Sequence, residues 1–255
     1  MRVVFIGAGN LATRLSLEMK RAGITIDQVY SQTEANAKVL AAKLGALWTN
    51  SLDEIVEDAD IYIFSLKDSA LCDVINRMKP NNALWVHTAG SIPISVFAGY
   101  SNRFGVIYPL QTFSKEREVD LKSVPFFLEA SNSDDAKILS MLAGAISQDV
   151  RFLSSEKRSK LHLAAVFACN FVNHIYSLAG NILADDDIPF DVLLPLIDET
   201  AKKIHLMSPS QAQTGPAIRY DQNVINRHLS MLDDPDMKDI YSLISNSIHK
   251  EASHE

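Results

Sequence analysis

A glycine pattern directly after the first apolar run constrains the fold of this chain more than any other feature. Residues 3–6 read Val-Val-Phe-Ile, which is typical of a buried strand, and Gly7, Gly9 and Ala12 follow at once. Apolar residues then recur every four positions, as in an amphipathic helix. The first glycine allows a tight turn, the second lets a ligand approach the backbone, and a small third residue lets helix and strand pack closely. The pattern therefore predicts a Rossmann-type loop.

The start of the helix after this loop is a predicted phosphate site. Its first backbone N–H groups have no partner within the helix, and the helix dipole favours negative charge there. A dinucleotide binds such a loop through its pyrophosphate, so we expect a dinucleotide cofactor. The residues expected to contact it are Gly7, Ala8, Gly9, Asn10, Leu11 and Ala12.

The end of the second strand bears on which dinucleotide binds. In NAD-binding domains a carboxylate about 20 residues after the loop hydrogen-bonds the ribose 2′-hydroxyl. Here the sequence reads Tyr30-Ser31-Gln32-Thr33. This segment has no carboxylate that would repel a 2′-phosphate. Ser31, Gln32 and Thr33 offer hydrogen-bond donors to such a phosphate, and Lys38 follows about one helical turn further on. These residues favour NADP over NAD, although they also fit a plain strand-to-helix connection with Thr33 as N-cap.

Strand and helix signals alternate through the first part of the chain and then change. Short apolar runs alternate with helical patterns, which is typical of a mostly parallel sheet covered by helices. After residue 153 only helical periodicity remains. We therefore predict an α/β fold, with a Rossmann domain at 1–153 and an all-α domain at 154–255. The expected strands are 3–6, 29–30, 61–64, 84–86, 106–107, 126–129 and 150–153, and the expected helices are near 10–22, 34–44, 69–78, 93–98, 134–146, 156–183, 191–207, 221–232 and 236–249.

Composition and charge narrow the class of partner. The 255 residues are 47% hydrophobic and carry a formal net charge of −7, without long runs of like charge. This balance argues against nucleic acid and an anionic membrane surface, and leaves a small molecule as the expected ligand. With no leader segment and no apolar stretch long enough to span a membrane, we expect a cytoplasmic protein. Cys72 and Cys169 are expected to be buried free thiols, and Asp185–Asp187 an interhelical loop rather than a metal site.

Polar residues also follow three further predicted strands, at the edge where open α/β sheets bind ligands. Ser65, Leu66 and Lys67 come after one strand and are expected to contact the cofactor. His87 ends the next strand, where it would either face the nicotinamide and exchange a proton with a substrate, or remain a structural histidine. Tyr108 ends a third strand and would either donate a proton or pack as an aromatic under the cofactor.

The helical half supplies further polar candidates. Asn170 lies in a mostly apolar run, where an amide needs a hydrogen-bond partner, either a substrate or the backbone of a neighbouring helix. Arg219 follows a turn and has the fork geometry that binds carboxylate or phosphate. Asp221 can cap the next helix, and His228 lies seven residues later on the same face, so the two either point at a cleft or lie on a solvated surface. The catalytic candidates are Asn170, His87, His228 and Arg219, and we expect no metal ligands.

With these motifs the chain resembles the superfamily of pyrroline-5-carboxylate reductases, 6-phosphogluconate dehydrogenases and 3-hydroxyacid dehydrogenases. It resembles more closely the Rossmann-like proteins whose C-terminal half is the domain of unknown function 2520. The match spans nearly the whole chain. The residues that carry it are Gly7-Ala8-Gly9-Asn10-Leu11-Ala12, Val29-Tyr30-Ser31, His87-Thr88-Ala89-Gly90, Pro109-Leu110-Gln111-Thr112-Phe113, Ala164-Ala165-Val166-Phe167-Ala168-Cys169-Asn170 and Thr214-Gly215-Pro216.

The resemblance implies an NADP-dependent oxidoreductase whose all-α C-terminal domain is of the 6-phosphogluconate dehydrogenase-like type. It also implies a homodimer formed through the helical domains. Three positions depart from the relatives. The 3-hydroxyacid dehydrogenases have a catalytic lysine where this chain has Val166, and the closer relatives commonly have arginine at Gln32 and histidine at Tyr108.

We therefore expect an enzyme that transfers a hydride between NADP(H) and a small carbonyl or imine substrate. In this hypothesis Asn170 orients the substrate, His87 or His228 moves a proton, and Arg219 holds an acidic group. The rival hypothesis is an NADP-binding sensor or scaffold protein without turnover, which the lack of a lysine at position 166 favours.

Overall fold

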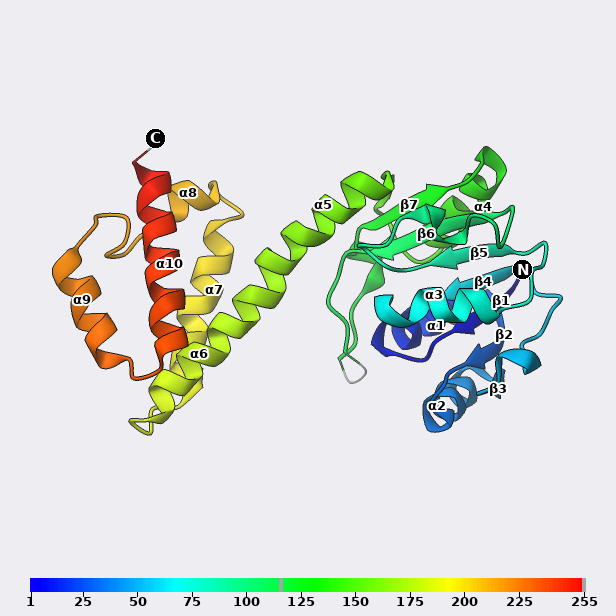
Figure 1. The fold of residues 1–255 in the computed structure, drawn as a ribbon, viewed down its shortest axis with the longest axis horizontal. Helices are drawn as coiled ribbons and strands as arrows, with labels where there is room; N and C mark the ends of the chain where they lie inside the picture. Colours follow the sequence, from blue (N-terminus) through cyan, green and yellow to red (C-terminus); the bar gives the residue numbers. More distant parts are fainter. Residues whose placement is uncertain (115–116, 254–255) are drawn as a thin grey trace. The chain divides into compact units, whose positions relative to one another are not determined.

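The computed structural model describes residues 1–114 and 117–253 (Figure 1). Contacts within the chain divide it into two compact units, Met1–Cys169 and Asn170–Glu255. The first unit contains all the strands, and the described part of the second contains only helices and loops. The predicted Rossmann domain followed by a helical domain is confirmed.

The first unit is built on one eight-stranded sheet with the order β3-β2-β1-β4-β5-β6-β7-β8. All neighbouring strands are parallel except β6 and β7. The strand order reverses between β1 and β4, and this switch point is where Rossmann sheets bind dinucleotides. The strands are β1 (Arg2–Ile6), β2 (Thr25–Tyr30), β3 (Leu47–Thr49), β4 (Ile61–Phe64), β5 (Leu84–His87), β6 (Phe104–Pro109), β7 (Phe126–Ala130) and β8 (Val150–Phe152).

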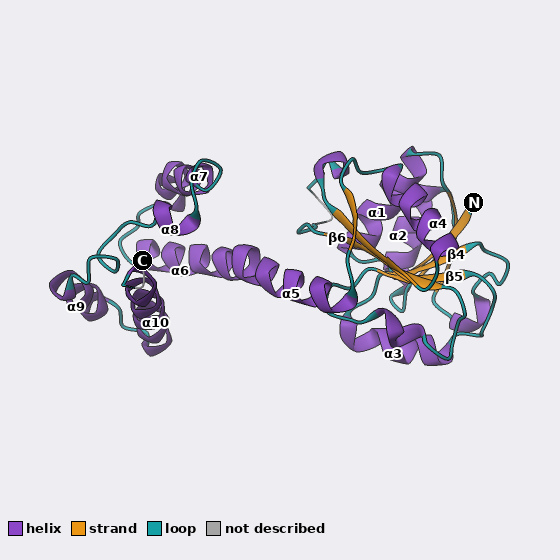
Figure 2. Cartoon of the chain, turned by 90° about the horizontal axis from the view of Figure 1, so that it is seen from above, coloured by secondary structure: helices purple, strands orange, loops and turns teal. Residues whose placement is uncertain are grey.

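Helices cover both faces of this sheet (Figure 2). On one face α1 (Asn10–Arg21), α2 (Glu34–Leu44) and α4 (Ser133–Gly144) bury one apolar cluster, and on the other α3 (Asp68–Arg77) and the 3₁₀ segment Ile94–Phe97 bury a second. Alternate residues of β1 contribute to the two clusters, because successive side chains of a strand point to opposite faces. The helix expected near 93–98 is in the structure the short 3₁₀ segment Ile94–Phe97.

A long helical stretch begins at α5 (Ser155–Ala165), continues as a π-helical segment, Val166–Phe171, and ends as α6 (Val172–Ala184). The first turns of α5 pack on the sheet, where Leu161 joins the apolar cluster around Tyr108 and Phe127. For this reason the first unit extends to residue 169, later than the predicted boundary at 153.

Three helices of the second unit begin with a side-chain cap. Asp221 and Asp234 accept hydrogen bonds from backbone N–H groups at the starts of α9 and α10, and Ser208 forms a capping box with Gln211. Such caps satisfy N–H groups that have no helical partner. Besides α6, the elements are a 3₁₀ turn, Phe190–Leu193, α7 (Leu194–Lys203), α8 (Pro209–Ala212), α9 (Gln222–Met231) and α10 (Pro235–Ala252).

The long helical stretch leaves much apolar surface exposed. By length and composition alone, Ser155–Ala184 could cross a membrane, with a mean hydropathy of 1.3 in a window of which none is buried within the chain. This differs from the expectation that no such stretch exists. However, the Arg158 side chain has no exposed surface and is held by Glu129 of β7, so the start of the helix belongs to the protein core.

The two cysteines differ from the expectation that both are buried. Cys72 is exposed on α3, and Cys169 is half-buried in the π-helical segment. Cys72 lies next to Leu71, which does face the core, so the helical pattern of α3 turns the thiol outwards.

Candidate functional site

Gly7 makes a turn that other residues cannot make. Its φ is +120°, and a Cβ at this position would lie 2.1 Å from the carbonyl oxygen of Ser65. Its N–H donates to the carbonyl of Tyr30 at 2.8 Å, so the loop is tied to β2 as well as packed against the end of β4. Backbone strain and the steric clash both require glycine here.

Gly9, by contrast, faces open space. It is the N-cap of α1, where no side chain accepts from the first N–H groups, and a Cβ on it would meet nothing within 4 Å. These N–H groups and the helix dipole form an anion site with room for a phosphate beside the backbone. Ala12 is fully buried against the sheet, as the loop pattern predicted. The loop thus fits a dinucleotide pyrophosphate.

A second loop lies against the same helix start. The Asn10 side-chain amide donates to the carbonyl of Phe113 at 2.9 Å, and Nε of Arg14 donates to the carbonyl of Ser114 at 3.1 Å. The chain that follows β6 is therefore fixed to the first turn of α1. Asn10 was expected to contact the cofactor, and its amide also has this role in holding the loop.

The end of β2 carries no carboxylate, as predicted. The Ser31 N–H donates to Thr49 of β3 at 3.1 Å, and its hydroxyl accepts from the N–H of Thr33 at 3.3 Å, while Gln32 and Thr33 are exposed. Lys38 does not extend freely from α2, because its Nζ lies 2.5 Å from Glu34 and 4.5 Å from the ring centroid of Trp48.

Ser65, Leu66 and Lys67 connect β4 to α3 at the carboxyl edge of the sheet. Ser65 continues the pairing with β1 through its N–H, which donates to the Ile6 carbonyl at 2.8 Å. Ser65 and Leu66 are half-buried and Lys67 is exposed. Ser65 and Leu66 lie beside Gly7 of the glycine loop, and the contact of all three residues with the cofactor stays a prediction.

His87 is enclosed at the end of β5. Its side chain has no exposed surface, its Nδ1 accepts from the N–H of Ala89 at 3.2 Å, and Nε2 finds no partner within the described chain. Burial, reinforced by the positive charge of Arg158, lowers the pKa of His87 to about 3. An imidazole that is neutral and enclosed at pH 7 is poorly suited to give a proton to a substrate, so the burial favours the structural alternative.

Tyr108 meets a histidine that the sequence did not single out as a catalytic candidate. The Tyr108 hydroxyl lies 3.1 Å from Nδ1 of His162 on α5, and the two rings meet edge to face. The His162 ring rests on Gly90, where a Cβ would be 2.6 Å from Nδ1. Burial raises the pKa of Tyr108, against the opposing effect of Arg158. The pair lies at the carboxyl edge of β5 and β6.

The candidates in the helical unit have different surroundings. Asn170 lies in the π-helical segment and is exposed, and Arg219 is also exposed. His228 is half-buried and shares a hydrogen bond of 2.8 Å between Nδ1 and the Tyr241 hydroxyl, which joins α9 to α10. The possible Asp221–His228 pair is not formed, because Asp221 caps α9 and His228 binds Tyr241.

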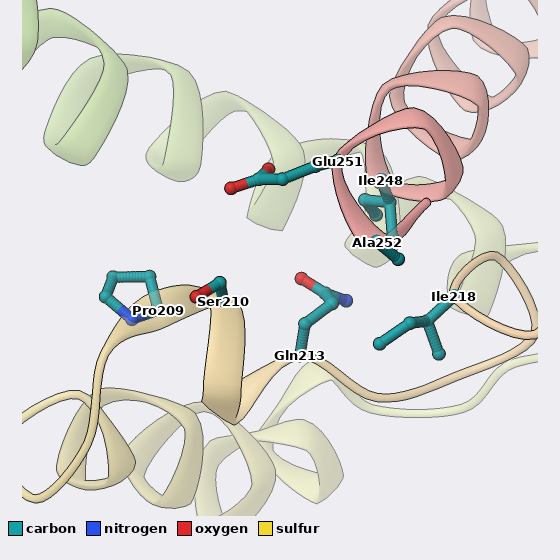
Figure 3. Close-up of a pocket in the computed structure, with 7 residues that line it drawn as sticks. All are labelled: Pro209, Ser210, Gln213, Ile218, Ile248, Glu251 and Ala252. Atoms are coloured by element: carbon teal, nitrogen blue, oxygen red, sulfur yellow. The ribbon is translucent and has the colours of Figure 1, made fainter. Parts of the chain in front are cut away.

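A small cavity of about 110 Å³ lies within the helical unit (Figure 3). One carboxylate is the only ionisable group in its lining, and none of the predicted site residues contributes to it. Within residues 1–114 and 117–253, no group of histidines, cysteines and acids could hold a metal ion. The cavity is lined by Pro209, Ser210, Gln213, Ile218, Ile248, Glu251 and Ala252.

Known proteins share both halves of this arrangement. Residues 2–99 match the family described as NADP oxidoreductase coenzyme F420-dependent, and residues 124–248 match the domain of unknown function 2520. A Bacteroides fragilis protein called a "putative NADP oxidoreductase" is 53% identical, with a TM-score of 0.92 and 98% of each chain covered. A Thermotoga maritima protein shares the fold, at 23% identity and a TM-score of 0.78 over 99% of this chain and 100% of that one.

A pyrroline-5-carboxylate reductase of Pisum sativum is 26% identical over 152 residues. The match covers 56% of this chain and 54% of the pea protein, so the chain spans about half the length of this relative. The family matches confirm the predicted resemblance. They also confirm the predicted cofactor, NADP. The chain therefore belongs to the same family as the Bacteroides fragilis protein, and in it a Rossmann domain that matches the NADP oxidoreductase family precedes the domain of unknown function 2520.

Proposed function

We propose that this protein is an NADPH-dependent reductase of a small carbonyl or imine compound. The observation that carries the proposal is the open backbone at Gly9, beside the uncapped start of α1 and a β2 end without a carboxylate. The loop would hold the pyrophosphate, and Ser31, Gln32 and Thr33 would hold the 2′-phosphate. When bound, the cofactor supplies a hydride from its nicotinamide ring.

The nicotinamide half of a dinucleotide belongs to the second half of a Rossmann sheet, at the carboxyl ends of β4, β5 and β6. Ser65, Leu66 and Lys67 lie at this edge, and the Tyr108 hydroxyl is at the end of β6. The substrate-binding roles of Asn170 and Arg219, which belong to the helical unit, stay predictions from the sequence. The likeness to a pyrroline-5-carboxylate reductase supports an imine as much as a carbonyl.

Titration with NADPH and NADH, followed by a panel of small carbonyl and imine compounds, tests this function. We expect NADPH to bind more tightly than NADH and at least one compound to oxidise it, seen as lost absorbance at the reduced nicotinamide band. Failure to bind either nucleotide would contradict the proposal.

The second candidate is an NADP-binding sensor or scaffold without turnover. Val166, where the 3-hydroxyacid dehydrogenases have a lysine, and the enclosed imidazole of His87 favour it. Tight NADPH binding with no oxidation by any compound of the panel is the outcome that would select this candidate.

We also propose that a second copy of the chain covers the exposed apolar surface of the helical unit, giving a cytoplasmic homodimer. Apolar side chains such as Ile175 and Ile182 are 38% and 46% exposed on α6, and patches of this kind in a protein with a soluble-type fold mark interfaces. The helical stretch that contains α6 begins with Arg158, whose charge is paired with Glu129 of the sheet. This supports a protein rather than lipid as the cover of the apolar surface. Light scattering after size exclusion should give the mass of two chains.

A further inference from the structure

We propose that Tyr108 and His162 form the proton-donating pair of this reductase, with Tyr108 as the group that protonates the substrate and His162 as the group that restores its proton. The inference rests on the proposed reductase function. It assigns the acid to residues outside the four catalytic candidates of the sequence, and in particular in place of His87.

The pair is held where a substrate would meet the nicotinamide. Tyr108 ends β6, which pairs with β5 up to His87, and both strands end at the ligand-binding edge of the sheet. Tyr108 is 8% exposed, so most of its side chain is packed and a small part of the residue still reaches the surface. His162 comes from α5, some fifty residues later in the sequence, so tertiary packing alone brings the two together.

Space for the His162 ring is made by a glycine. A Cβ at Gly90 would lie 2.6 to 2.9 Å from three atoms of the His162 side chain, so any other residue would push the imidazole away from Tyr108. Four residues before His162, on the same face of α5, Arg158 is fixed by the Glu129 carboxylate at 2.5 Å and by the Ile92 carbonyl at 2.6 Å. These contacts fix the first turn of α5 to the sheet, and His162 lies on the next turn of the same helix.

The charges around the pair suit an acid. Burial raises the pKa of Tyr108, so the phenol is protonated at neutral pH and has a proton to give. The positive charge of Arg158 acts in the opposite direction and would stabilise the phenolate once it forms. Two neighbouring ionisable groups do not oppose this effect, since Glu129 is paired with Arg158 and His87 is neutral at pH 7.

The step balances without a further reactant. Hydride addition to the carbon of a C=O or neutral C=N bond leaves an electron pair on oxygen or nitrogen. The O–H bond of Tyr108 breaks and its proton joins that atom, which leaves a phenolate. Nε2 of the neutral His162 ring takes a proton from solvent as Nδ1–H gives its proton to the phenolate oxygen, so no imidazolate forms. Proton exchange with solvent then restores the Nδ1–H tautomer for the next turnover.

The first test asks whether the pair lies at the cofactor and needs no substrate. Protein labelled with carbon-13 at tyrosine Cζ and nitrogen-15 in histidine rings is titrated with NADP⁺ and followed by NMR, with signals assigned from Tyr108→Phe and His162→Gln. We expect the Tyr108 and His162 signals to shift on binding, while those of Tyr100 and His205 stay in place. Binding of NADP⁺ with both signals unmoved would overturn the proposal.

The second test uses whichever compound of the carbonyl and imine panel the wild-type protein reduces fastest. Tyr108→Phe should lower kcat by about 100-fold or more while the Kd for NADPH stays the same. His162→Gln should lower kcat less and flatten its pH dependence, since the histidine only resupplies the proton. Tyr100→Phe and His205→Gln, the matched controls, should change neither quantity.

The outcomes separate this proposal from the proposed function. Normal turnover in Tyr108→Phe would overturn the pair and leave the reductase intact. Absence of any turnover in the wild-type protein would overturn the reductase, and with it the pair as an acid, whatever the NMR titration shows. A loss of NADPH binding in Tyr108→Phe equal to the loss of activity would show packing under the cofactor instead of proton donation.

Discussion

Nη1 of Arg158 donates to a carboxylate oxygen of Glu129 across 2.5 Å, and this contact joins the first turn of α5 to β7. The Arg158 side chain is fully buried, and the Glu129 side chain is 19% exposed. Ser155 also donates to the same carboxylate oxygen at 2.7 Å. A buried guanidinium needs such partners, because its charge loses water on folding.

Removal of the carboxylate should therefore be costly. We expect Glu129→Ala to lower the free energy of unfolding by about 3–5 kcal/mol, since it leaves the Arg158 charge buried and unpaired. Glu129→Gln keeps an acceptor and should lose less. Glu156→Ala, which removes an exposed pair with Lys160, should change stability by less than about 0.5 kcal/mol. Urea denaturation followed by circular dichroism measures all three, and equal losses in Glu129→Ala and Glu156→Ala would refute the role of the buried pair.

The buried His87 should make stability depend on pH. Its pKa of about 3 in the folded protein is below the 6.5 of an ordinary histidine, so the unfolded chain takes up a proton first as the pH falls. The contribution of His87 to the free energy of unfolding has its full value above pH 6.5 and falls progressively between pH 6.5 and 3. Relative to His87→Asn, which keeps an acceptor for the Ala89 N–H, the wild type should lose about 2 kcal/mol between pH 6.5 and 5. Parallel stability curves for the two proteins would show that His87 does not titrate in this way.

The end of β2 should set the choice of nucleotide. Ser31→Asp places a carboxylate where NAD-binding domains have one, so we expect NADPH to bind about 10-fold more weakly and NADH to bind as well or better. Gln32→Arg adds a guanidinium fork for the 2′-phosphate and should tighten NADPH binding several-fold. Ser31→Asn is the uncharged control. Fluorescence titration gives each Kd, and an unchanged NADPH to NADH ratio in Ser31→Asp would place the 2′-phosphate elsewhere.

The proposed dimer should depend on α6. Ile175→Glu puts a charge into the apolar surface that a second copy would cover, so we expect the mass in solution to fall from two chains towards one at micromolar concentration. Val39→Glu, at an apolar residue on α2 that is 59% exposed, is the matched control and should leave the mass unchanged. Two chains in both variants would remove α6 from the interface.

Local sequence signals predicted most of the Rossmann unit. The central strands β1, β4 and β5 carry continuous apolar runs, and the loop pattern of Gly7 and Gly9 depends only on neighbouring residues, so both could be read without the fold. Strand β3 was missed because it is a three-residue edge strand whose Leu47 and Trp48 are exposed. The π-helical segment that holds Asn170 was also missed, since its apolar stripe looks like that of an ordinary α-helix.

The surroundings of the candidate acids could not be predicted in the same way. His87 ends a strand that is buried on both faces, and its ring packs against Phe97 from a later segment, while Arg158 from a still later one lowers its pKa. The contact of Tyr108 with His162 depends on the packing of α5 against the sheet, for which the sequence has no local signal. Gly90 is the one indirect sign, because a small residue beside a predicted site leaves room for a larger side chain from elsewhere.

Gly9→Val tests most directly whether the glycine loop is the proposed cofactor site. A Cβ at Gly9 would meet no protein atom within 4 Å, so we expect the variant to fold and melt like the wild type while its side chain occupies the pyrophosphate position. Gly144→Val, at another glycine with free space around it, controls for the substitution itself. In a fluorescence titration with NADPH we predict at least about 100-fold weaker binding for Gly9→Val, because charge-assisted hydrogen bonds to the backbone are lost, and unchanged binding for Gly144→Val. Wild-type affinity in a folded Gly9→Val protein would contradict the account.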